Sequence, residues 1–504
     1  MKTAAFALAC LLALALAAGP AAPAAADPRE VLPYNHWAYA ALYRLAASGL
    51  APFWAASARP LSRGEVAVMV AQAAERARTG SPGQSATTGA ASQSAGTAAP
   101  GPGDLLDLEA LQAEFAEELR MLAAGEAPPA GPRLGLGVTG WLSSGTAPRD
   151  SRHSGSGVEL GRLYLAGRVA RRQSPGGTQT SEGSRGTLAG LLGEVTLQAG
   201  RDTLRWGPGA RGAFLLSDNA GPLDLLRLSA TGERLRFTKV IGPVADPERW
   251  LYALRLDWRA SDTLRLGLGE VVVGQGGPYW LYALNPVPGV SYAALVHLRG
   301  RAGFNDNYNL ALDFDWALRP GVVFYGELYA DDLILTPDNP FPHRIGGTVG
   351  LFLRDPFGGG RTTLRLEHSR VTNWVYAVTG HTADYIKAGR PPGHWCAPDC
   401  ELWSLTAARI VAPDRTLEVG YDLIRKGQGA LGDTWTDAAD AWARLYLSGL
   451  VETTHALRAA YTFARPRGSS HTVGVRYSTV ANAGHVSGAS RQDWFFMWEA
   501  SYGF

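Results

Sequence analysis

From about residue 133 to the end of the chain, apolar and polar residues alternate in short runs. The run from Leu364 to His368 reads Leu-Arg-Leu-Glu-His, and the run from Leu310 to Trp316 alternates in the same way. Because successive side chains of a strand point to opposite faces, each run predicts a β-strand with one apolar and one charged face. Breaks rich in glycine or proline separate the runs, at 174–183, 274–278, 337–342, 358–360 and 427–433. The pattern predicts a mainly β domain over residues 133–504.

The last run of this domain is unusually aromatic. The chain ends on Phe504, and one face of the run carries Trp494, Phe496, Trp498, Ala500 and Tyr502. This run resembles the C-terminal signal by which outer-membrane barrels are recognised for insertion. An aromatic last strand in a soluble β-sandwich is the alternative interpretation. The resemblance implies that the barrel-insertion machinery is a partner of the chain through Phe504.

The sequence after the first 26 residues does not predict a membrane-spanning helix. After residue 26 it has no apolar run of the roughly 18–20 residues that a membrane helix needs. In lipid, only helices and closed barrels satisfy every backbone polar group. We therefore predict a large antiparallel transmembrane β-barrel of about 16–18 strands, in contact with outer-membrane lipids.

The first 26 residues have the composition of an export signal. Lys2 gives a positive start, residues 4–18 form an apolar stretch, and residues 24–26 offer a small-residue cleavage site. The apolar stretch is too short to span a bilayer. We predict a secretory signal peptide over residues 1–26, so that the barrel lies in the cell outer membrane.

Residues 27–78 predict a small helical module on the periplasmic side. Around Trp37 the apolar residues recur on one helix face until Gly49. Ser62 is a suitable N-cap for a second helix, and Glu65 completes a capping box.

Two short blocks of this module resemble an S-layer homology motif. They are His-Trp-Ala-Tyr at 36–39 and Arg-Pro-Leu-Ser-Arg-Gly-Glu at 59–65. The resemblance implies binding to peptidoglycan or another wall polymer. Its wall-binding candidates are Trp37, Arg63 and Glu65. A purely structural periplasmic cap is the alternative.

Two further segments lie before the barrel. Residues 79–103 are rich in Gly, Ser, Ala, Thr and Pro, a composition that predicts a flexible linker. Residues 104–124 predict an amphipathic helix, with its apolar face at Leu108, Leu111, Phe115, Leu119 and Leu122. Its polar face is acidic, which favours packing on a protein surface over an anionic membrane.

The charge balance bears on possible partners. The 504 residues contain 47 Lys and Arg and 45 Asp and Glu, a net charge of +2. Such a balance gives no electrostatic support for a nucleic-acid partner. Lysine occurs only at positions 2, 239, 387 and 426, so nearly all the positive charge is arginine. Either the genome is rich in G and C, or arginines line a site for acidic groups.

No motif for catalysis is present in the sequence. It has no G-x-S-x-G elbow and no H-E-x-x-H pair. Glu367, His368 and Ser369 are adjacent on one predicted strand, so their side chains cannot converge as a triad. We predict a protein that is not an enzyme and that needs no cofactor or metal. Cys396 and Cys400 are expected to form a disulfide in an exported protein, with a metal pair beside His394 as the less favoured alternative.

One segment, Gly200–Ser229, fits neither a strand nor an exposed loop. Its glycines and prolines break any regular element, yet it contains Trp206 and the apolar run 214–216. A barrel of this size encloses a wide lumen unless something fills it. We therefore predict that residues 200–222 form an inward loop that occludes the barrel.

The same segment resembles a known family. Gly-Arg-Asp at 200–202, Trp-Gly-Pro-Gly at 206–209 and Leu-Ser-Asp-Asn-Ala-Gly-Pro at 216–222 are similar to a block of the Wzi-type capsule-assembly outer-membrane proteins. Tyr-Ala-Leu-Asn-Pro at 282–286 is similar to a further motif of that family. The resemblance implies an 18-stranded barrel with periplasmic helices, occluded by loops, that helps attach or organise capsular or surface polysaccharide.

Sugar binding calls for aromatic faces and for Arg or Asn side chains. The candidates for the polysaccharide site or the plug are Arg201, Asp202, Arg205, Trp206, Gly207, Pro208, Gly209, Arg211, Ser217, Asn219, Pro222 and Trp395, with Tyr385 and His394 nearby in sequence. For Trp206 and Trp395, plain packing is the alternative role. For the whole protein, the alternatives are a wall-tethered porin for small solutes and an outer-membrane hydrolase.

Overall fold

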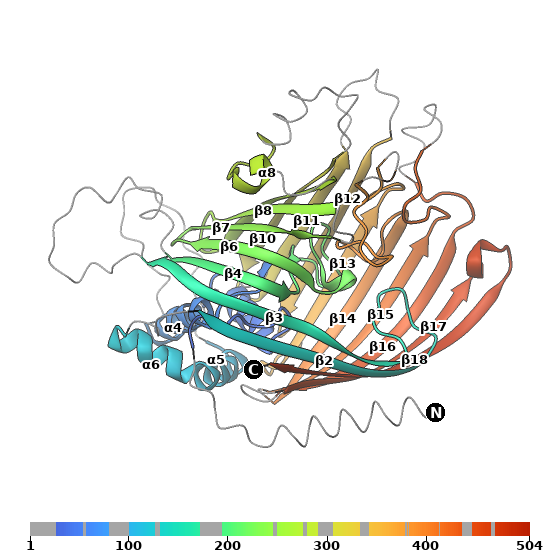
Figure 1. The fold of residues 1–504 in the computed structure, drawn as a ribbon. Coiled ribbons are helices and arrows are strands. Elements are labelled where there is room, and N and C mark those ends of the chain that lie inside the picture. The colour runs from blue at the N-terminus through green and yellow to red at the C-terminus, as the bar shows by residue number, and fades with distance from the viewer. Residues whose placement is uncertain are drawn as a thin grey trace.

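The computed structural model describes residues 27–53, 57–79, 100–126, 132–171, 194–244, 249–275, 280–290, 306–332, 342–378, 381, 383–412, 414–435, 446–464 and 469–503. The predicted signal peptide (1–26), most of the predicted linker (80–99) and Phe504 lie outside the described residues. What is described comprises one β-barrel and a group of N-terminal helices (Figure 1).

Sixteen antiparallel strands close into a single barrel, which confirms the predicted fold class. The ring closes where β9 pairs with β10 and where the last strand, β18, pairs with β2. In the described residues the count of sixteen lies within the predicted 16–18 and is lower than the 18 that the family resemblance implies. The strands are β2 (Arg133–Gly145), β3 (Ser156–Arg171), β4 (Glu194–Asp202), β6 (Leu223–Thr231), β7 (Leu235–Pro243), β8 (Arg249–Arg259), β9 (Leu264–Gln275), β10 (Asn307–Arg319), β11 (Val322–Asp332), β12 (Arg344–Arg354), β13 (Thr362–Val371), β14 (Cys400–Ala412), β15 (Arg415–Lys426), β16 (Glu452–Ala464), β17 (Ser469–Ala481) and β18 (Ser490–Gly503).

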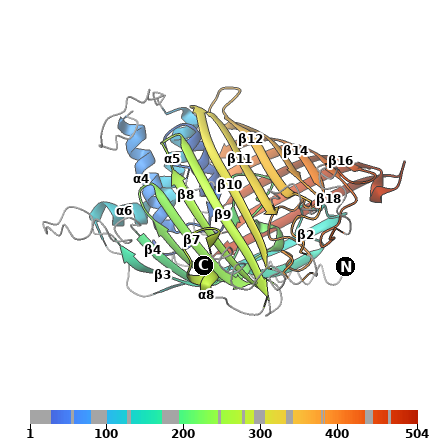
Figure 2. The same ribbon diagram turned by 90° about the horizontal axis from the view of Figure 1, so that it is seen from above.

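The two ends of the barrel differ (Figures 1 and 2). Strand β2 begins and β18 ends at the end that carries the N-terminal helices, which we call the periplasmic end. The opposite end, here the outer end, carries several long connections. Three of them matter for the site: the first loop (146–155), the plug loop (203–222) and the cysteine loop (372–399).

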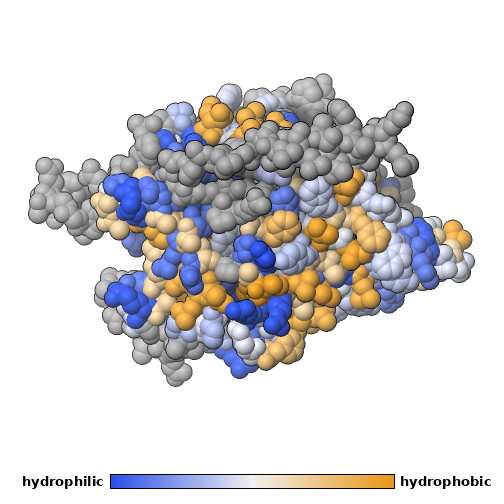
Figure 3. Space-filling model, turned by 90° about the horizontal axis from the view of Figure 1, so that it is seen from below, coloured by the Kyte–Doolittle hydropathy of each residue, from blue (hydrophilic) through white to orange (hydrophobic). Residues whose placement is uncertain are grey.

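The barrel wall follows the alternation of the sequence. On β15, Leu417, Val419 and Tyr421 are exposed on the outside, while Glu418 and Asp422 lie on the opposite, inner face. Apolar side chains also gather over the face seen from below (Figure 3). An apolar outer surface with charged residues inside is what a strand barrel needs in lipid.

A fully buried ion cluster occupies the inner face of β8, β9 and β10. Arg255 contacts Asp313 at 2.8 Å, and Arg265 contacts Asp257 at 3.0 Å. Asp315 is a further partner of Arg265, at 2.7 Å. Buried charges are tolerated only when they are paired and hydrogen-bonded, and here each carboxylate has an arginine beside it.

The helices α2 (Trp37–Ala47), α4 (Arg63–Thr79), α5 (Pro102–Glu114) and α6 (Ala116–Ala124) precede the barrel. The predicted capping box of α4 is present. The Ser62 N–H donates to Glu65 Oε2 at 2.8 Å, and the Glu65 N–H donates to Ser62 Oγ at 3.2 Å. Within the described ranges, no helix has the length and apolar content to cross a membrane. The short elements are β1 (Ala58–Arg59), β5 (Arg205–Trp206), α8 (Trp280–Leu284) and 3-10 turns at Asp218–Ala220 and Ala483–His485.

The segment predicted as one amphipathic helix over 104–124 is two helices, so that prediction is wrong in its continuity. Phe115 has φ −105° and ψ 21°, outside the helical region, and separates α5 from α6. Its side chain is fully buried, within one apolar cluster that also contains Leu108 and Leu111. The break allows α5 and α6 to run in different directions. Periodicity alone could not indicate such a break, because the apolar spacing continues across it.

The N-terminal helices are docked into the periplasmic end of the barrel. Tyr325 and Phe352 of the inner wall belong to the same apolar cluster as α2 and α4. The Tyr43 hydroxyl donates to Asp315 at 3.2 Å, and Arg354 of β12 pairs with Asp104 at 2.7 Å. The sequence predicted a module set apart by a linker, but the helices share a core with the barrel.

Candidate functional site

The plug loop (203–222) turns inward and fills the middle of the barrel. It leaves β4 at Asp202 and returns to β6 at Leu223, residues that face each other in the strand pairing. A tight turn would suffice to join them, so the intervening residues form an inserted structure. Trp206 and Phe214 are 1% and 0% exposed. Strand β5 of the loop pairs with β1, so the plug loop is joined directly to the N-terminal module.

Carboxylates of the inner wall hold the backbone of the plug loop. Glu367 of β13 accepts hydrogen bonds from the N–H groups of Ala210 and Arg211, at 2.6 and 2.9 Å. Glu327 of β11 accepts one from the Phe214 N–H at 3.1 Å. Hydrogen bonds to a carboxylate are stronger than those between neutral groups, so the wall fixes the loop at two points.

Gly207 shows why the plug loop needs glycine at one position. Its φ is +133°, and a side chain there would meet Glu327 Oε2 at 2.8 Å. Its N–H donates to the Ser57 carbonyl at 2.8 Å, next to the β1–β5 pair. The left-handed backbone and the close wall leave room only for a hydrogen atom.

The cysteine loop covers the plug loop from the outer end. The Tyr376 hydroxyl donates to the Phe214 carbonyl at 2.7 Å, and the Tyr385 hydroxyl donates to the Leu215 carbonyl. The Trp395 indole N–H donates to the Arg211 carbonyl. These aromatic residues bind the protein's own backbone. The contacts of Trp395 fit packing, which was the alternative to a role in sugar binding.

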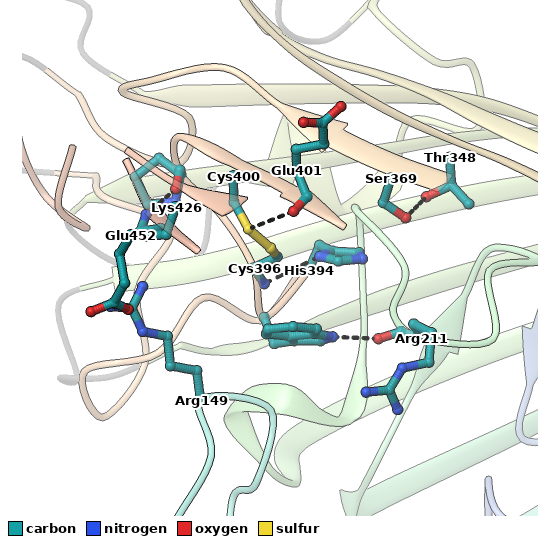
Figure 4. Close-up of a disulfide and its surroundings, with 12 residues drawn as sticks. Arg149, Arg211, Thr348, Ser369, His394, Cys396, Cys400, Glu401, Lys426 and Glu452 are labelled. Carbon is teal, nitrogen blue, oxygen red and sulfur yellow. Dashed lines mark hydrogen bonds and ion pairs between the residues drawn. A yellow bond between two sulfur atoms is a disulfide. The ribbon is translucent and has the colours of Figure 1, made fainter. Parts of the chain in front are cut away.

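Cys396 and Cys400 are joined as a disulfide at the start of β14 (Figure 4). His394 lies beside it and stacks on Phe214, with ring centroids 4.9 Å apart. Burial lowers the pKa of His394 to about 3, with Arg211 and Arg205 acting in the same direction, so the ring is neutral at physiological pH. No group of three metal-ligating side chains occurs in the described part of the chain.

The first loop ties the plug loop to the far wall through Asp150. Its carboxylate pairs with Arg211 of the plug loop and with Arg476 of β17, both at 2.6 Å. Arg211 also reaches Asp422 of β15 at 3.0 Å. Burial raises the pKa of Asp150, but Arg476 and Arg211 outweigh that effect and bring its pKa down to about 2. These pairs cross the lumen on the side of β15–β18.

Acidification should release the first loop from the plug loop only below about pH 4. Because the pKa of Asp150 is lowered in the folded state, its ion pairs contribute fully above the unfolded value and are lost as the pH falls towards 2. A fluorophore at Ala147→Cys should report the release. Asp150→Asn should give the released signal already at pH 7. A transition above pH 5, or no effect of Asp150→Asn, would contradict this assignment.

Below these pairs, the same side of the lumen is less filled. Glu418 of β15 keeps 40% of its side chain exposed although it faces inward. Thr406 and Thr462, also on the inner face, are half-buried. The inner face of β14–β16 is therefore less completely covered at these positions than at Asp422, which is fully buried beside the plug loop.

Three cations converge on the turn Asp218–Ala220 at the outer surface of the plug loop. Arg152 donates to the Asp218 carbonyl at 3.3 Å, Arg390 to Asn219 Oδ1 at 3.2 Å, and Lys387 to the Ala220 carbonyl at 3.1 Å. Among the ion pairs of the described residues, none includes Lys387 or Arg390. Both are half-buried, and burial lowers the pKa of each. They can donate to a further carboxylate at little cost.

Most of the predicted site residues are brought together in the plug loop, but Trp395 lies in the cysteine loop and two others lie in a barrel strand. Arg201 and Asp202 belong to β4. Arg201 lies on the outer face of the wall and pairs with Asp224 at 2.7 Å, so its prediction as a plug residue is wrong. Asp202 faces inward and pairs with Arg162 at 2.9 Å. Successive side chains of a strand point to opposite faces, so the direction of Arg201 depends on where β4 ends. That end could not be located from the sequence.

The remaining candidates have partners within the protein. Arg205 donates to the Ala210 carbonyl at 3.0 Å, and Asn219 donates to the Pro391 carbonyl at 2.9 Å. The Ser217 N–H donates to the Pro392 carbonyl at 2.6 Å. Pro208 and Gly209 are buried, and the Pro222 carbonyl accepts from Lys387. As an interior plug these residues are well explained, while their contact with a sugar stays a prediction.

The wall-binding candidates also have internal contacts. Arg63 is buried against Glu114 at 2.8 Å and lies over the Phe115 ring. Glu65 accepts from Thr231 of the barrel at 2.8 Å. Trp37 is half-buried against the apolar core of the module. Binding of a wall polymer by these side chains remains a prediction.

The residues around the plug loop that the sequence did not indicate are wall carboxylates and loop cations. Glu327, Glu367 and Asp150 anchor the plug loop, and Lys387 and Arg390 line its outer surface. One sequence signal could have indicated the wall carboxylates. An isolated carboxylate at an inward position of a strand needs a buried partner.

The chain was compared with known proteins. A model of the family described as "Capsule assembly protein Wzi" matches residues 145–493. This chain belongs to that family. The match confirms the membership that the Gly200–Ser229 block predicted. It begins inside the barrel, so the S-layer homology resemblance at the N-terminus stays a prediction. A search of curated proteins finds no match.

Among solved structures, the Wzi family member from Escherichia coli is similar in fold. It is described as an outer-membrane protein involved in group 1 capsule assembly and as a carbohydrate-binding β-barrel. The identity is 15%, the TM-score is 0.56, and the match covers 94% of this chain and 99% of that one. Two Pseudomonas aeruginosa barrels, OccD3 and OccK10, are each 12% identical, cover 74% of this chain and 91% and 98% of their own length, and have TM-scores of 0.39 and 0.37. This Wzi family chain is an outer-membrane β-barrel.

Proposed function

We propose that this protein binds a capsular or surface polysaccharide at its outer end and takes part in its assembly or attachment without catalysing a reaction. Membership of the Wzi family carries this proposal. The E. coli relative is described as carbohydrate-binding, which supports the ligand class. The interior supports a binding protein too, because Glu327 and Glu367 are committed to holding the plug loop.

The polysaccharide meets the protein at the loop cations, not inside the plug. Arg390 and Lys387 are half-buried and bind carbonyl or amide oxygens. A sugar carboxylate offers either of them a charge-assisted hydrogen bond. The ligand is therefore an acidic polysaccharide. Other partners are the outer-membrane lipids, the insertion machinery through Phe504 and, through the N-terminal module, peptidoglycan or a wall polymer.

Arg390→Gln should weaken binding of an acidic polysaccharide by roughly tenfold, because one hydrogen bond to a charged group is lost. Arg415→Gln, an exposed arginine beside the periplasmic end of β15, is the matched control and should bind as the wild type does. Isothermal titration with an acidic and a neutral capsule fragment measures both. Equal loss in the two variants, or binding of the neutral fragment alone, would contradict the proposed site.

In cells, deleting the gene should move polysaccharide from the surface into the medium. Capsule imaging and an assay of free polysaccharide measure this, and the Arg390→Gln variant should restore retention only in part. Unchanged surface retention in the deletion strain would defeat the function itself, whatever the binding data show.

A wall-tethered porin for small solutes is the second candidate. The observation that favours it is the inward Glu418 of β15, whose side chain is still 40% exposed. A porin needs an open path through the lumen to the outer end, and the ion pairs of Asp150 with Arg211 and Arg476 oppose such a path. Conductance of the intact protein decides between the two candidates.

A further inference from the structure

A segment at the outer end folds against the outside of the barrel. We call residues 280–290, which include α8, the outer strap. Figures 1 and 2 both draw α8 outside the ring of strands. On β8, Arg255 and Asp257 face the lumen, so Tyr252 three residues before Arg255 faces outward. Tyr252 is nevertheless only 1% exposed, because Tyr282 of the strap packs on it with ring centroids 5.2 Å apart.

The outer strap covers a polar spot on the outer wall. Lys239 of β7 and Glu270 of β9 both point outward, on the face opposite the inward Arg236 and Arg265. Lys239 donates to the Asn285 carbonyl at 3.2 Å, and Glu270 accepts from the Gly289 N–H at 2.6 Å. The wall therefore holds the strap by charged groups that would otherwise be exposed to lipid.

The free side of the strap is apolar. Its large side chains lie open, with exposures of 70% for Trp280, 77% for Leu284 and 52% for Val290. Exposed aromatic and aliphatic residues on a loop beside a membrane wall are typical of an element inserted at the lipid interface.

A groove of about 680 Å³ runs between the strap and the neighbouring strands. Its walls are almost entirely apolar, and its central side chains are Leu160, Leu163, Leu226, Ile241, Trp250 and Trp280. Arg201 and Asp224 line it as well. They form an ion pair at the outer end of the barrel, where β4 ends and β6 begins.

The outer end of the groove carries a surplus positive charge. Arg201 pairs with Asp224 at 2.7 Å, and Arg152 pairs with Glu159 at 3.1 Å. Among the ion pairs of the described residues, Lys387 of the cysteine loop adds a third cation to these two carboxylates. Lys387 itself donates to the carbonyls of Ala220 and Pro222. The groove thus combines an apolar body at membrane depth with a cationic mouth at the outer interface.

We propose that this groove binds an acyl chain of an anionic, phosphate-bearing lipid of the outer leaflet, with the lipid phosphate received by Arg201 and Lys387. A hydrocarbon chain suits the apolar walls, and an anionic head group suits the mouth. The site extends beyond the proposed function and adjoins the polysaccharide surface at Lys387, which belongs to both. It would fix a lipid beside the cysteine loop, which covers the plug.

The test uses the full-length protein in detergent, incubated with phosphatidylglycerol or with phosphatidylcholine, and counts bound lipid by native mass spectrometry. The wild type should retain phosphatidylglycerol and prefer it to phosphatidylcholine. Leu226→Trp fills the groove and should lower retention by roughly tenfold or more. Leu417→Trp on β15 is the matched control, since both leucines lie on the outer wall with 40–44% exposure. It should bind as the wild type does.

Trp280→Ala is a second variant that removes one wall of the groove without filling it, and it should also lose the lipid. Heat-dependent migration on a gel verifies that each variant is a folded barrel. Equal retention in Leu226→Trp and Leu417→Trp would overturn the proposal, as would a wild type that retains no lipid or does not discriminate the head groups. A photo-crosslinker at Leu226 that captures a polypeptide in cells would instead identify a protein partner.

Discussion

Replacing the plug loop by a tight turn should raise the conductance of the barrel by roughly tenfold or more, because a barrel of this size leaves an aqueous channel when nothing fills it. Asp202 and Leu223 face each other in the strand pairing, so a two-residue turn can join β4 to β6 without strain. The replacement removes Arg211 and with it the ion pairs to Asp150 and Asp422. The inner face of β15 around Asp422 should then be accessible from the outer end, even with the N-terminal helices in place. Single-channel recording in planar bilayers measures the change.

A matched control shortens a different connection of the outer end. The loop over 482–489 lies between β17 and β18, and within the described residues its polar contacts are to neighbouring strands and loops at the rim. Shortening it should leave the conductance as in the wild type. High conductance of the intact protein would contradict the occluded barrel and favour the porin. No gain on removal of the plug loop would show that the cysteine loop and the helices close the lumen by themselves.

The barrel could be predicted from sequence because the alternation that marks a strand involves only neighbouring residues. In each strand, residues that face the outside alternate with residues that face the lumen. On β15, Leu417 and Val419 face the outside and Glu418 faces the lumen. The plug loop could also be predicted, since Trp206 is too apolar for a surface loop and the neighbouring glycines break a strand.

What could not be predicted is which inner-wall residues meet the plug loop. Glu367 lies 157 residues from Ala210 in the chain, and no local pattern connects them. Arg201 illustrates the opposite problem, because a shift of a single residue at the end of β4 reverses inside and outside. The outer strap was missed for a related reason. Its sequence is that of an apolar loop, and only the outward Lys239 and Glu270 explain why it returns to the wall.

Arg63→Ala should detach α5 and α6 from α4. The Arg63 side chain is 3% exposed and pairs with Glu114 and Glu118, both fully buried. Its removal leaves two carboxylates buried without their counter-charge, which costs about 3–5 kcal/mol. Hydrogen–deuterium exchange should then accelerate throughout α5 and α6 while the barrel strands stay protected. Arg78→Ala on the same helix is the control, because Arg78 is 74% exposed and, among the described residues, pairs with Glu75 alone. It should leave exchange unchanged.

A rescue variant separates the effect of charge from that of shape. Arg63→Met combined with Glu114→Gln and Glu118→Gln removes all three charges while roughly keeping their volumes, and should restore much of the protection. The same set of variants decides between the two roles of the N-terminal module. If Arg63 serves a structural cap, wall-polymer binding follows helix protection in every variant. If Arg63→Ala abolishes that binding while exchange stays as in the wild type, the side chain is a wall ligand, and its burial against Glu114 must open when the polymer binds.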